Sequence, residues 1–184
     1  MAETDEQLML AFAQGDAGAF DRLYARHKRT VFRFIVRSLP SRADAEEIFQ
    51  DVWMKAIEAR GRYEPRAKFT TWLYAIAHNR LVDMWRRKGL TLVPLDDETD
   101  EHAAIDPPDD PANEPSAQVA TRQAMARFEL AFAELPPAQR EAFVLKEEAG
   151  MSIAEIAAAT SSHEQAVKSR LRYATAKLRE ALDG

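Results

Sequence analysis

The fold is decided first by residues 152–172, which read SIAEIAAATSSHEQAVKSRLR. Ser152, followed three residues later by Glu155, has the spacing of a capping box and predicts a short helix from Ile153 to Ala159. A break of four residues then precedes a second helix, over about residues 164–181. Two helices joined by so tight a turn predict a helix-turn-helix.

The second predicted helix has an apolar face and a basic face. Four apolar residues recur at helical spacing: Val167, Leu171, Ala174 and Leu178. The other face presents Gln165, Lys168, Ser169, Arg170 and Arg172. Arginine and lysine can bond guanine edges, glutamine can bond adenine, and small polar groups can hold phosphate. We expect this face to bind DNA, although a solvated basic surface is the alternative.

The remaining helical signals predict an all-α fold. Residues 117–134 predict a helix that ends at Leu135-Pro136-Pro137, and Pro137 suits the first turn of a helix to about Ala149-Gly150. Nearer the N-terminus, helices are expected over 5–14, about 20–35, 44–57, and from about 70 to 88. Ser41 is a plausible N-cap for the third of these. No stretch alternates like a strand.

An acidic segment divides the chain. Residues 89–115 contain nine acids, no lysine or arginine, and five of the nine prolines. We expect an extended linker between two small helical domains, residues 1–88 and 116–184. It is either a simple tether or an imitation of a nucleic-acid backbone inside a basic channel of a partner.

Composition narrows the possible classes of protein. The net charge of −5 comes from the linker, because residues 1–88 hold 16 basic against 12 acidic side chains. Cysteine is absent, which excludes disulfides and thiolate metal sites. The acidic start has no signal-peptide core, and no apolar run reaches the roughly 20 residues of a membrane span. We therefore expect a cytoplasmic protein without membrane insertion.

A second motif occupies residues 68–88, KFTTWLYAIAHNRLVDMWRRK. Trp72, Asn79 and Arg86 stand seven residues apart, so they share one helix face outside the apolar stripe. Arg80 and Arg87 flank this line. Aromatic rings interleaved with cations suit unpaired nucleotides, because rings stack on bases while cations follow phosphates. The alternative is that the aromatic side chains are simply core.

The C-terminal stretch resembles the −35 recognition domain of extracytoplasmic-function (ECF) sigma factors. The matching residues are Leu135-Pro136, Gln139-Arg140-Glu141, Glu155-Ile156-Ala157 and Val167-Lys168-Ser169-Arg170-Leu171. The chain departs from the family in the turn. Ser161 stands where glycine is frequent and His163 where a serine cap is usual, so Ser162 is an alternative cap.

Residues 68–88 are similar to the family segment that melts and reads the −10 element. The resemblance rests on Phe69, Thr71-Trp72-Leu73, Ile76-Ala77, Asn79, Asp83 and Arg86-Arg87, and it implies that the loop over about 61–70 captures a flipped base. Extruding a base costs a few kcal/mol, which a pocket must offset. The candidate −10 residues are Arg62, Tyr63, Lys68, Phe69, Trp72, Asn79, Arg80, Arg86 and Arg87.

The helix over 44–57 resembles the family's main contact with the clamp helices of RNA polymerase. The candidate contacts are Asp44, Glu47, Ile48, Asp51, Val52 and Trp53. Glu47 and Asp51 are like charges four residues apart, a penalty of about 0.2–0.5 kcal/mol that a basic partner would relieve. Val52 and Trp53 offer apolar area beyond one stripe. Core packing with ordinary surface acids is the alternative.

The resemblance implies a sigma factor that binds core RNA polymerase and promoter DNA, duplex at −35 and single-stranded at −10. It also implies an anti-sigma partner. We expect no catalytic activity, cofactor or metal site, because no phosphate loop occurs and the four histidines lack ligand spacing. The alternatives are a stand-alone helix-turn-helix regulator that binds duplex DNA and a helical adaptor that contacts only proteins.

Overall fold

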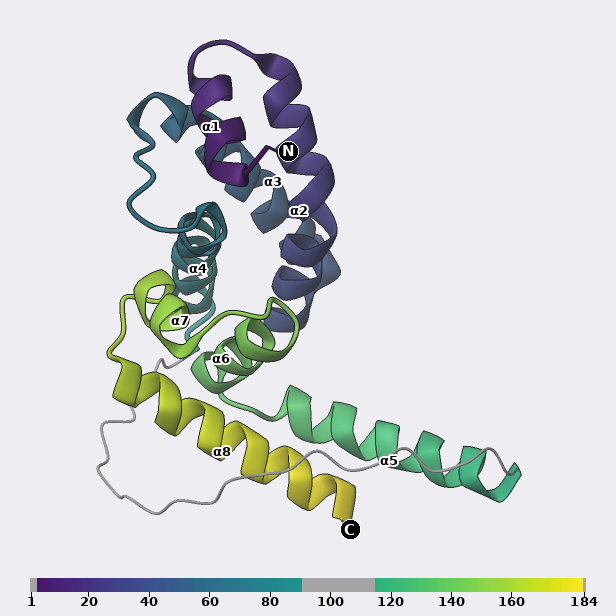
Figure 1. Ribbon diagram of the computed structural model, residues 1–184. Coiled ribbons are helices and arrows are strands. Elements are labelled where there is room, and N and C mark those ends of the chain that lie inside the picture. Colours follow the sequence, from purple (N-terminus) through teal and green to yellow (C-terminus); the bar gives the residue numbers. More distant parts are fainter. Residues whose placement is uncertain (1–2, 91–114, 184) are drawn as a thin grey trace.

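The computed structural model describes residues 3–90 and 115–183, and every regular element in these ranges is a helix (Figure 1). The all-α prediction is confirmed. The elements are α1 (Asp5–Ala13), α2 (Ala17–Ser38), α3 (Arg42–Ala59), the 3₁₀ turn η1 (Arg60–Arg62), α4 (Phe69–Arg87), α5 (Pro115–Ala133), α6 (Pro137–Glu147), α7 (Ile153–Ala159) and α8 (Glu164–Asp183). Most of the predicted linker, and His102 within it, lies outside the described residues.

Side-chain caps explain where several helices begin. Ser152 Oγ accepts a hydrogen bond from Glu155 N at 3.2 Å, and Glu155 Oε2 accepts one from Ser152 N at 2.8 Å, so the predicted capping box of α7 is present. Thr4 and Gln7 form a second capping box at α1. Ser41 caps α3 as expected, although the helix begins at residue 42.

Helix ends also follow the sequence signals. Pro137 occupies the first turn of α6, where its missing N–H removes no bond. Gly89 and Gly150 follow α4 and α6 with φ of +68° and +66°, the left-handed region that glycine enters without strain. These glycines therefore locate the ends of α4 and α6 to within two and three residues, respectively.

The N-terminal domain is a bundle in which α2 packs against α1, α3 and α4. Its core takes side chains from each long helix, including Phe34, Ile48 and Leu73, all at most 1% exposed. Trp85 near the end of α4 is also buried and donates from Nε1 to the carbonyl of Ser38 at 3.4 Å. Burial of these large side chains is the main stabilising contribution to the bundle.

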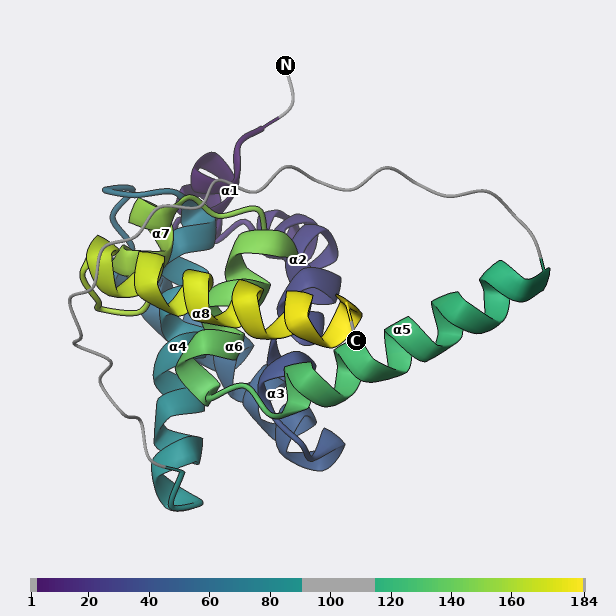
Figure 2. The same cartoon turned by 90° about the horizontal axis from the view of Figure 1, so that it is seen from below.

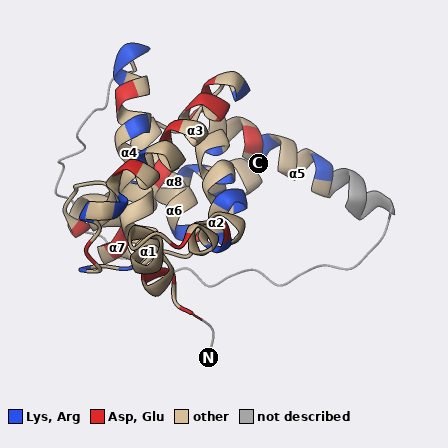
Figure 3. Ribbon diagram, turned by 90° about the horizontal axis from the view of Figure 1, so that it is seen from above, with Lys and Arg blue, Asp and Glu red and all other residues tan. Residues whose placement is uncertain are grey.

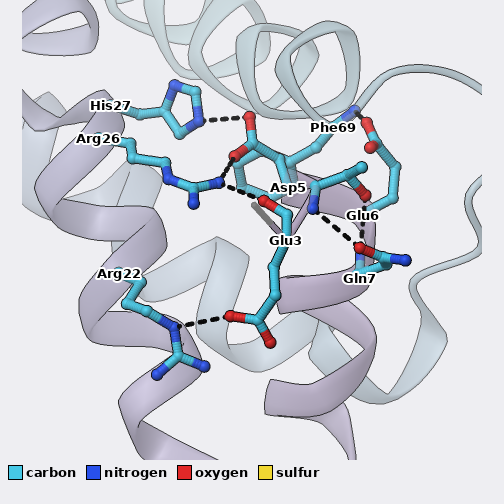
Figure 4. A network of polar contacts seen from close by, with 9 residues as sticks. Glu3, Asp5, Glu6, Gln7, Arg22, Arg26, His27 and Phe69 are labelled. Carbon is cyan, nitrogen blue, oxygen red and sulfur yellow. Dashed lines mark hydrogen bonds and ion pairs between the residues drawn. The ribbon is translucent and has the colours of Figure 1, made fainter. Parts of the chain in front are cut away.

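A polar network ties α1 to the start of α4 (Figure 4). Asp5 bonds Arg26 at 2.9 Å and His27 at 2.7 Å on α2. Next to it, Glu6 Oε1 accepts a hydrogen bond from the backbone N–H of Phe69 at 2.8 Å. The first N–H groups of a helix have no partner within the helix, so Glu6 both satisfies one of them and positions the start of α4.

The C-terminal domain is organised by α8, which packs against α5, α6 and α7. Val167, Ala174 and Leu178 face this core, as their spacing predicted. The N-terminal part of α5 projects away from the other helices (Figure 2). No helix in the described ranges is long and apolar enough to cross a membrane.

The two domains lie against each other, which the sequence did not predict. Helix α7 packs on α4, and α6 packs on α2 (Figure 1). The buried apolar side chains of both domains form one continuous cluster. The first helix of the helix-turn-helix therefore lies beside the helix that carries the second motif.

Candidate nucleic-acid and polymerase interfaces

The turn between α7 and α8 contains a backbone conformation that favours glycine. Ser161 has a φ of 49°, so it takes the left-handed conformation at the position where the family often has glycine. A residue with a Cβ atom pays roughly 1–2 kcal/mol for this conformation. The turn therefore keeps the geometry of a glycine turn in spite of the substitution.

Ser162 has a different role from the alternative cap that we considered. Helix α8 begins at Glu164, and Ser162 Oγ bonds Thr160 Oγ1 at 2.8 Å and accepts from Arg170 Nη1 at 2.8 Å. Ser162 thus connects the turn to the second turn of α8 and orients an arginine of the predicted recognition face.

The basic face of α8 is accessible. The side chains of Gln165, Lys168 and Arg172 are exposed, and those of Ser169 and Arg170 are partly buried. The guanidinium of Arg172 lies 5.3 Å from the ring centre of Tyr173. All five predicted residues therefore lie in the first half of one helix, which is the arrangement that major-groove recognition requires. Their contact with DNA stays a prediction.

The predicted −10 residues fall into three groups by exposure. Arg62, Lys68, Asn79, Arg86 and Arg87 are exposed, and Figure 3 shows the basic tip of α4 that Arg86 and Arg87 form. Trp72 and Arg80 are partly buried, with Arg80 bonded to Asp83 at 2.5 Å. Tyr63 and Phe69 are buried, at 7% and 1% exposure. Within the line of Trp72, Asn79 and Arg86, the last two side chains are exposed and Trp72 is partly exposed.

Three aromatic rings cluster where the loop meets α4. Tyr63 lies 5.0 Å from Trp72 and 6.2 Å from Phe69, measured between ring centres. Burial raises the pKa of Tyr63 to about 12, so its hydroxyl stays protonated. Tyr63 and Phe69 support Trp72 in this conformation, and a direct contact of either ring with a base would require it to leave the cluster.

Helix α3 divides its predicted contacts between core and surface. Glu47 is exposed and Asp51 is partly exposed, while Ile48, Val52 and Trp53 are at most 5% exposed. The expectation that Val52 and Trp53 offer spare apolar surface is therefore wrong for this conformation, because Trp53 packs edge-on against Tyr24 with ring centres 5.0 Å apart.

The exposed apolar residue of α3 is instead Met54, at 55% exposure. Asp44 forms an ion pair with Lys88, which lowers the pKa of that carboxyl below its usual value. Within the described ranges, neither Glu47 nor Asp51 has an ion-pair partner. These two acids are the groups on α3 that remain free to meet a basic partner surface.

Sequence reasoning missed the polar contacts between the domains. Lys68 Nζ lies 2.7 Å from Glu155 Oε1, and His78 Nδ1 lies 2.8 Å from Glu141 Oε1. The Lys68 ammonium lowers the pKa of Glu155, and the carboxylate raises the pKa of Lys68. The sequence predicts a capping role for Glu155 and no metal-ligand spacing for any histidine, so it gives neither Glu155 nor His78 a partner on the other domain. No local pattern reveals a partner on another domain.

No cluster of three or more metal-binding side chains occurs among the described residues. His27 bonds Asp5, His78 bonds Glu141, and His163 lies exposed in the turn before α8. The polar chemistry of the chain is therefore that of binding surfaces: a basic recognition helix, a mixed aromatic and basic helix, and an acidic helix.

Comparison with known proteins agrees with this arrangement. The family model described as Sigma-70 region 2 matches residues 23–91, and the one described as Sigma-70, region 4 matches residues 125–178. The first match covers most of α2 together with α3 and α4, and the second covers the helix-turn-helix. A stand-alone duplex regulator would account for the second match and leave the first unexplained.

Relatives match along nearly the whole chain. The ECF RNA polymerase sigma factor SigM of Mycobacterium tuberculosis is 33% identical over 180 residues, which is 97% of this chain and 85% of SigM. The RNA polymerase sigma factor CarQ of Myxococcus xanthus is 33% identical over 174 residues, or 95% of each chain.

Solved structures share the fold. CnrH in complex with the cytosolic domain of CnrY superposes with a TM-score of 0.68 at 24% identity and covers 98% of each chain. RpoE in complex with the anti-sigma factor NepR from Bartonella quintana gives a TM-score of 0.63 at 23% identity, covering 89% of this chain and 96% of RpoE. Sigma factors bind core RNA polymerase and direct promoter-specific initiation without catalysing a reaction themselves. This chain belongs to the ECF family of RNA polymerase sigma factors.

Proposed function

We propose that residues 1–88 bind core polymerase and melt and read the −10 element, that residues 116–184 read the −35 duplex, and that residues 89–115 join them. The main support for this division is the line on α4 formed by the partly exposed Trp72 and the exposed Asn79 and Arg86, because a regulator of duplex DNA alone has no use for it. The five polar residues on the first half of α8 support the −35 assignment.

At the −10 element, Trp72 would stack on an unpaired base while Asn79 bonds base edges. The exposed Arg62, Arg86 and Arg87 would follow the phosphates. Tyr63 and Phe69 pack against the Trp72 ring, with ring centres 5.0 and 5.7 Å away. A ring held in this way loses little side-chain entropy when a base stacks on it. A Trp72 ring held in this way favours stable binding of an unpaired base of the melted strand.

At the −35 element, α8 would enter the major groove with its N-terminal half. Lys168 and Arg172 are exposed for base or phosphate contacts, and Arg170 is already oriented by Ser162. Phosphate contacts hold the helix in register, and the contacts to base edges supply sequence preference. Substitution of the five residues one at a time identifies those that contact a base edge.

Core polymerase would meet α3 through Glu47, Asp51 and Met54. The two carboxylates need a basic partner surface, and Met54 supplies an adaptable apolar contact beside them. Because Ile48, Val52 and Trp53 hold the core, they shape this helix rather than touch the partner.

Reconstitution with core polymerase tests the proposal. Purified chain and core enzyme should initiate at promoters mapped from transcript start sites, and the complex should bind the single-stranded non-template strand of the −10 element. The triple variant K168A/R170A/R172A should lose −35-dependent initiation and keep its affinity for core enzyme. Failure to initiate at any mapped promoter would contradict the assignment.

We also propose a cytoplasmic location and an anti-sigma partner. Core polymerase works in the cytoplasm, and the similar CnrH and RpoE structures were each determined with a second protein, the cytosolic domain of CnrY and the anti-sigma factor NepR. A candidate partner should reduce the binding of this chain to core polymerase in a purified mixture. A protein that binds the chain and leaves that affinity unchanged is not an anti-sigma factor.

A further inference from the structure

Helix α4 begins without a cap from its own segment. Lys68 occupies the N-cap position and makes no side-chain hydrogen bond to the helix. The acceptor comes instead from α1, where Glu6 Oε1 accepts a hydrogen bond from the Phe69 N–H at 2.8 Å (Figure 4). A carboxylate in this place also meets the partial positive charge of a helix N-terminus. The start of α4 therefore depends on a residue 63 positions earlier in the chain.

A second contact from α1 reaches the ring of Phe69. Asp5 Oδ2 lies 2.7 Å from His27 Nε2, and the ring centre of His27 lies 5.5 Å from that of Phe69. The side chains of Asp5 and His27 are 22% and 16% exposed, so the pair is largely shielded from water. Two neighbouring acids of α1 thus hold Phe69, one through its backbone and the other through its ring.

Helix α1 also contacts the other end of the loop that precedes α4. It packs against η1, the turn that ends directly before Tyr63. On this side, the guanidinium of Arg60 lies 5.5 Å from the ring centre of Phe12, in the last turn of α1. The loop from Tyr63 to Lys68 is therefore attached to α1 both where it begins and where it ends.

Ring contacts connect these attachments to Trp72. The ring centre of Phe69 lies 5.7 Å from that of Trp72 and 6.2 Å from that of Tyr63. The buried hydroxyl of Tyr63 has no hydrogen-bond partner among the described residues, so packing positions this side chain. Burial, and next the charges of Glu6 and Asp5, raise the pKa of Tyr63 to about 12. The two carboxylates of α1 therefore lie beside the aromatic cluster.

We propose that Asp5 and Glu6 are positioning residues for the −10 element, which act through Phe69 to hold the Trp72 ring ready to stack on an unpaired base. The inference rests on the proposed stacking role of Trp72. A ring that must first be ordered binds a base more weakly, because the entropy lost in ordering it opposes binding. Helix α1 thus affects binding of the melted strand, although it carries none of the proposed DNA contacts.

Binding of a single-stranded oligonucleotide tests the proposal on the full chain in complex with core polymerase. The probe is a fluorescein-labelled non-template strand with the −10 element of a promoter mapped from transcript start sites. Glu6→Ala removes the acceptor for the Phe69 N–H and should weaken binding of this strand about three- to tenfold. The affinities for the −35 duplex and for core polymerase should stay unchanged.

Two further variants show whether the hydrogen bond is responsible. Glu6→Gln keeps an oxygen that can accept from the Phe69 N–H without the charge, so its affinity for the strand should lie between those of wild type and E6A. Glu3→Ala is the matched control, because Glu3 pairs with Arg22 on α2 at 3.4 Å. E3A should bind the strand as wild type does. Equal losses in E3A and E6A would overturn the proposal.

A double-mutant cycle separates positioning from a general loss of stability. Because Glu6 acts through Trp72, E6A should cause little further loss of affinity in a chain that already carries W72A. Asp16→Ala removes the cap of α2, at the opposite end of α1 from Glu6, and destabilises the same domain. D16A should leave strand binding unchanged in the folded chain. Additive losses in E6A/W72A, or a loss in D16A as large as that in E6A, would overturn the proposal.

The same measurements distinguish a failure of this inference from a failure of the proposed function. If W72A alone binds the strand normally, Trp72 has no stacking role, and the inference falls with that part of the proposed function. If W72A weakens binding and E6A does not, the stacking role stands and positioning by α1 is wrong.

Discussion

Arg170 Nη1 donates a hydrogen bond to Ser162 Oγ at 2.8 Å, so the turn of the helix-turn-helix holds an arginine of its own recognition helix. Arg170 is partly buried in this position, unlike the exposed Lys168 and Arg172. A side chain that is already oriented loses less entropy when it binds DNA.

We expect Ser162→Ala to weaken binding of the −35 duplex by the complex with core polymerase about two- to sixfold, since one hydrogen bond contributes about 0.5–1 kcal/mol. Fluorescence anisotropy over a salt series measures this. The salt dependence should stay unchanged in S162A, whereas R170A should reduce the slope by about one. Unchanged affinity in S162A would show that the bond does not orient Arg170.

Ser161→Gly should stabilise the C-terminal domain. Glycine removes the roughly 1–2 kcal/mol cost of φ 49°, and its greater freedom in the unfolded chain returns about 0.5–1 kcal/mol of that gain. The expected net rise in the free energy of unfolding is about 0.5–1 kcal/mol by urea denaturation. Ser161→Val is the opposite control, because a β-branched residue resists this conformation. A lower stability in S161G would contradict the inference that the backbone of Ser161 is strained.

Trp72→Ala should impair open-complex formation more than binding to core polymerase. The partly buried ring contacts Tyr63 and Phe69, so some loss of stability accompanies the loss of stacking. Trp72→Phe keeps most of that packing and is the control for folding. Permanganate reactivity of thymines at the −10 element reports melting. Normal melting in W72A would remove the stacking role.

Asp51→Arg should have the reverse effect, weakening the binding of core polymerase before any step on DNA. Its carboxylate has no ion-pair partner within the described ranges, so reversal of charge acts mainly on the partner surface. Gln50→Arg places the same arginine at the neighbouring exposed position of α3, with a charge change of one unit against two, and is the positional control. Equal losses in both variants would point to general charge repulsion instead of a specific contact.

The ionisation of Glu6 should make the N-terminal domain less stable at acid pH. The bond from the Phe69 N–H lowers the pKa of Glu6 below 4.5 in the folded chain, so its stabilising contribution is complete above pH 4.5 and is lost as the pH falls through the folded pKa. Glu6→Gln should therefore be less stable than wild type at neutral pH. The two proteins should converge in thermal unfolding once the pH has fallen below the lowered pKa of Glu6 in the folded chain. A difference that stays constant with pH would exclude this ionisation as the cause.

Local signals in the sequence were sufficient to predict where the helices lie. The Ser152–Glu155 box, Pro137 and Gly150 each act within one turn of backbone, so their consequences can be derived without a partner. The same holds for the basic face of α8, which depends only on helical spacing.

Contacts between distant segments could not be derived. Val52 and Trp53 add more apolar surface to α3 than a single buried stripe requires. The aromatic rings of α2 cover a second side of that helix, so this surface is buried as well. The sequence gives no partner for the side chain of Glu141 and only the capping role for Glu155, because His78 and Lys68 lie on another domain. Helical periodicity shows which residues share a face, and it does not show what covers that face.

The double bonding of Glu155 has an evolutionary consequence. A glutamine at this position still caps α7, but it cannot neutralise Lys68. Glutamate and glutamine codons differ by a single base, so one mutation can loosen the domain interface while leaving the helix intact. Descendants of this gene can therefore lose a charged contact between the two domains in one inherited step and keep the cap of α7.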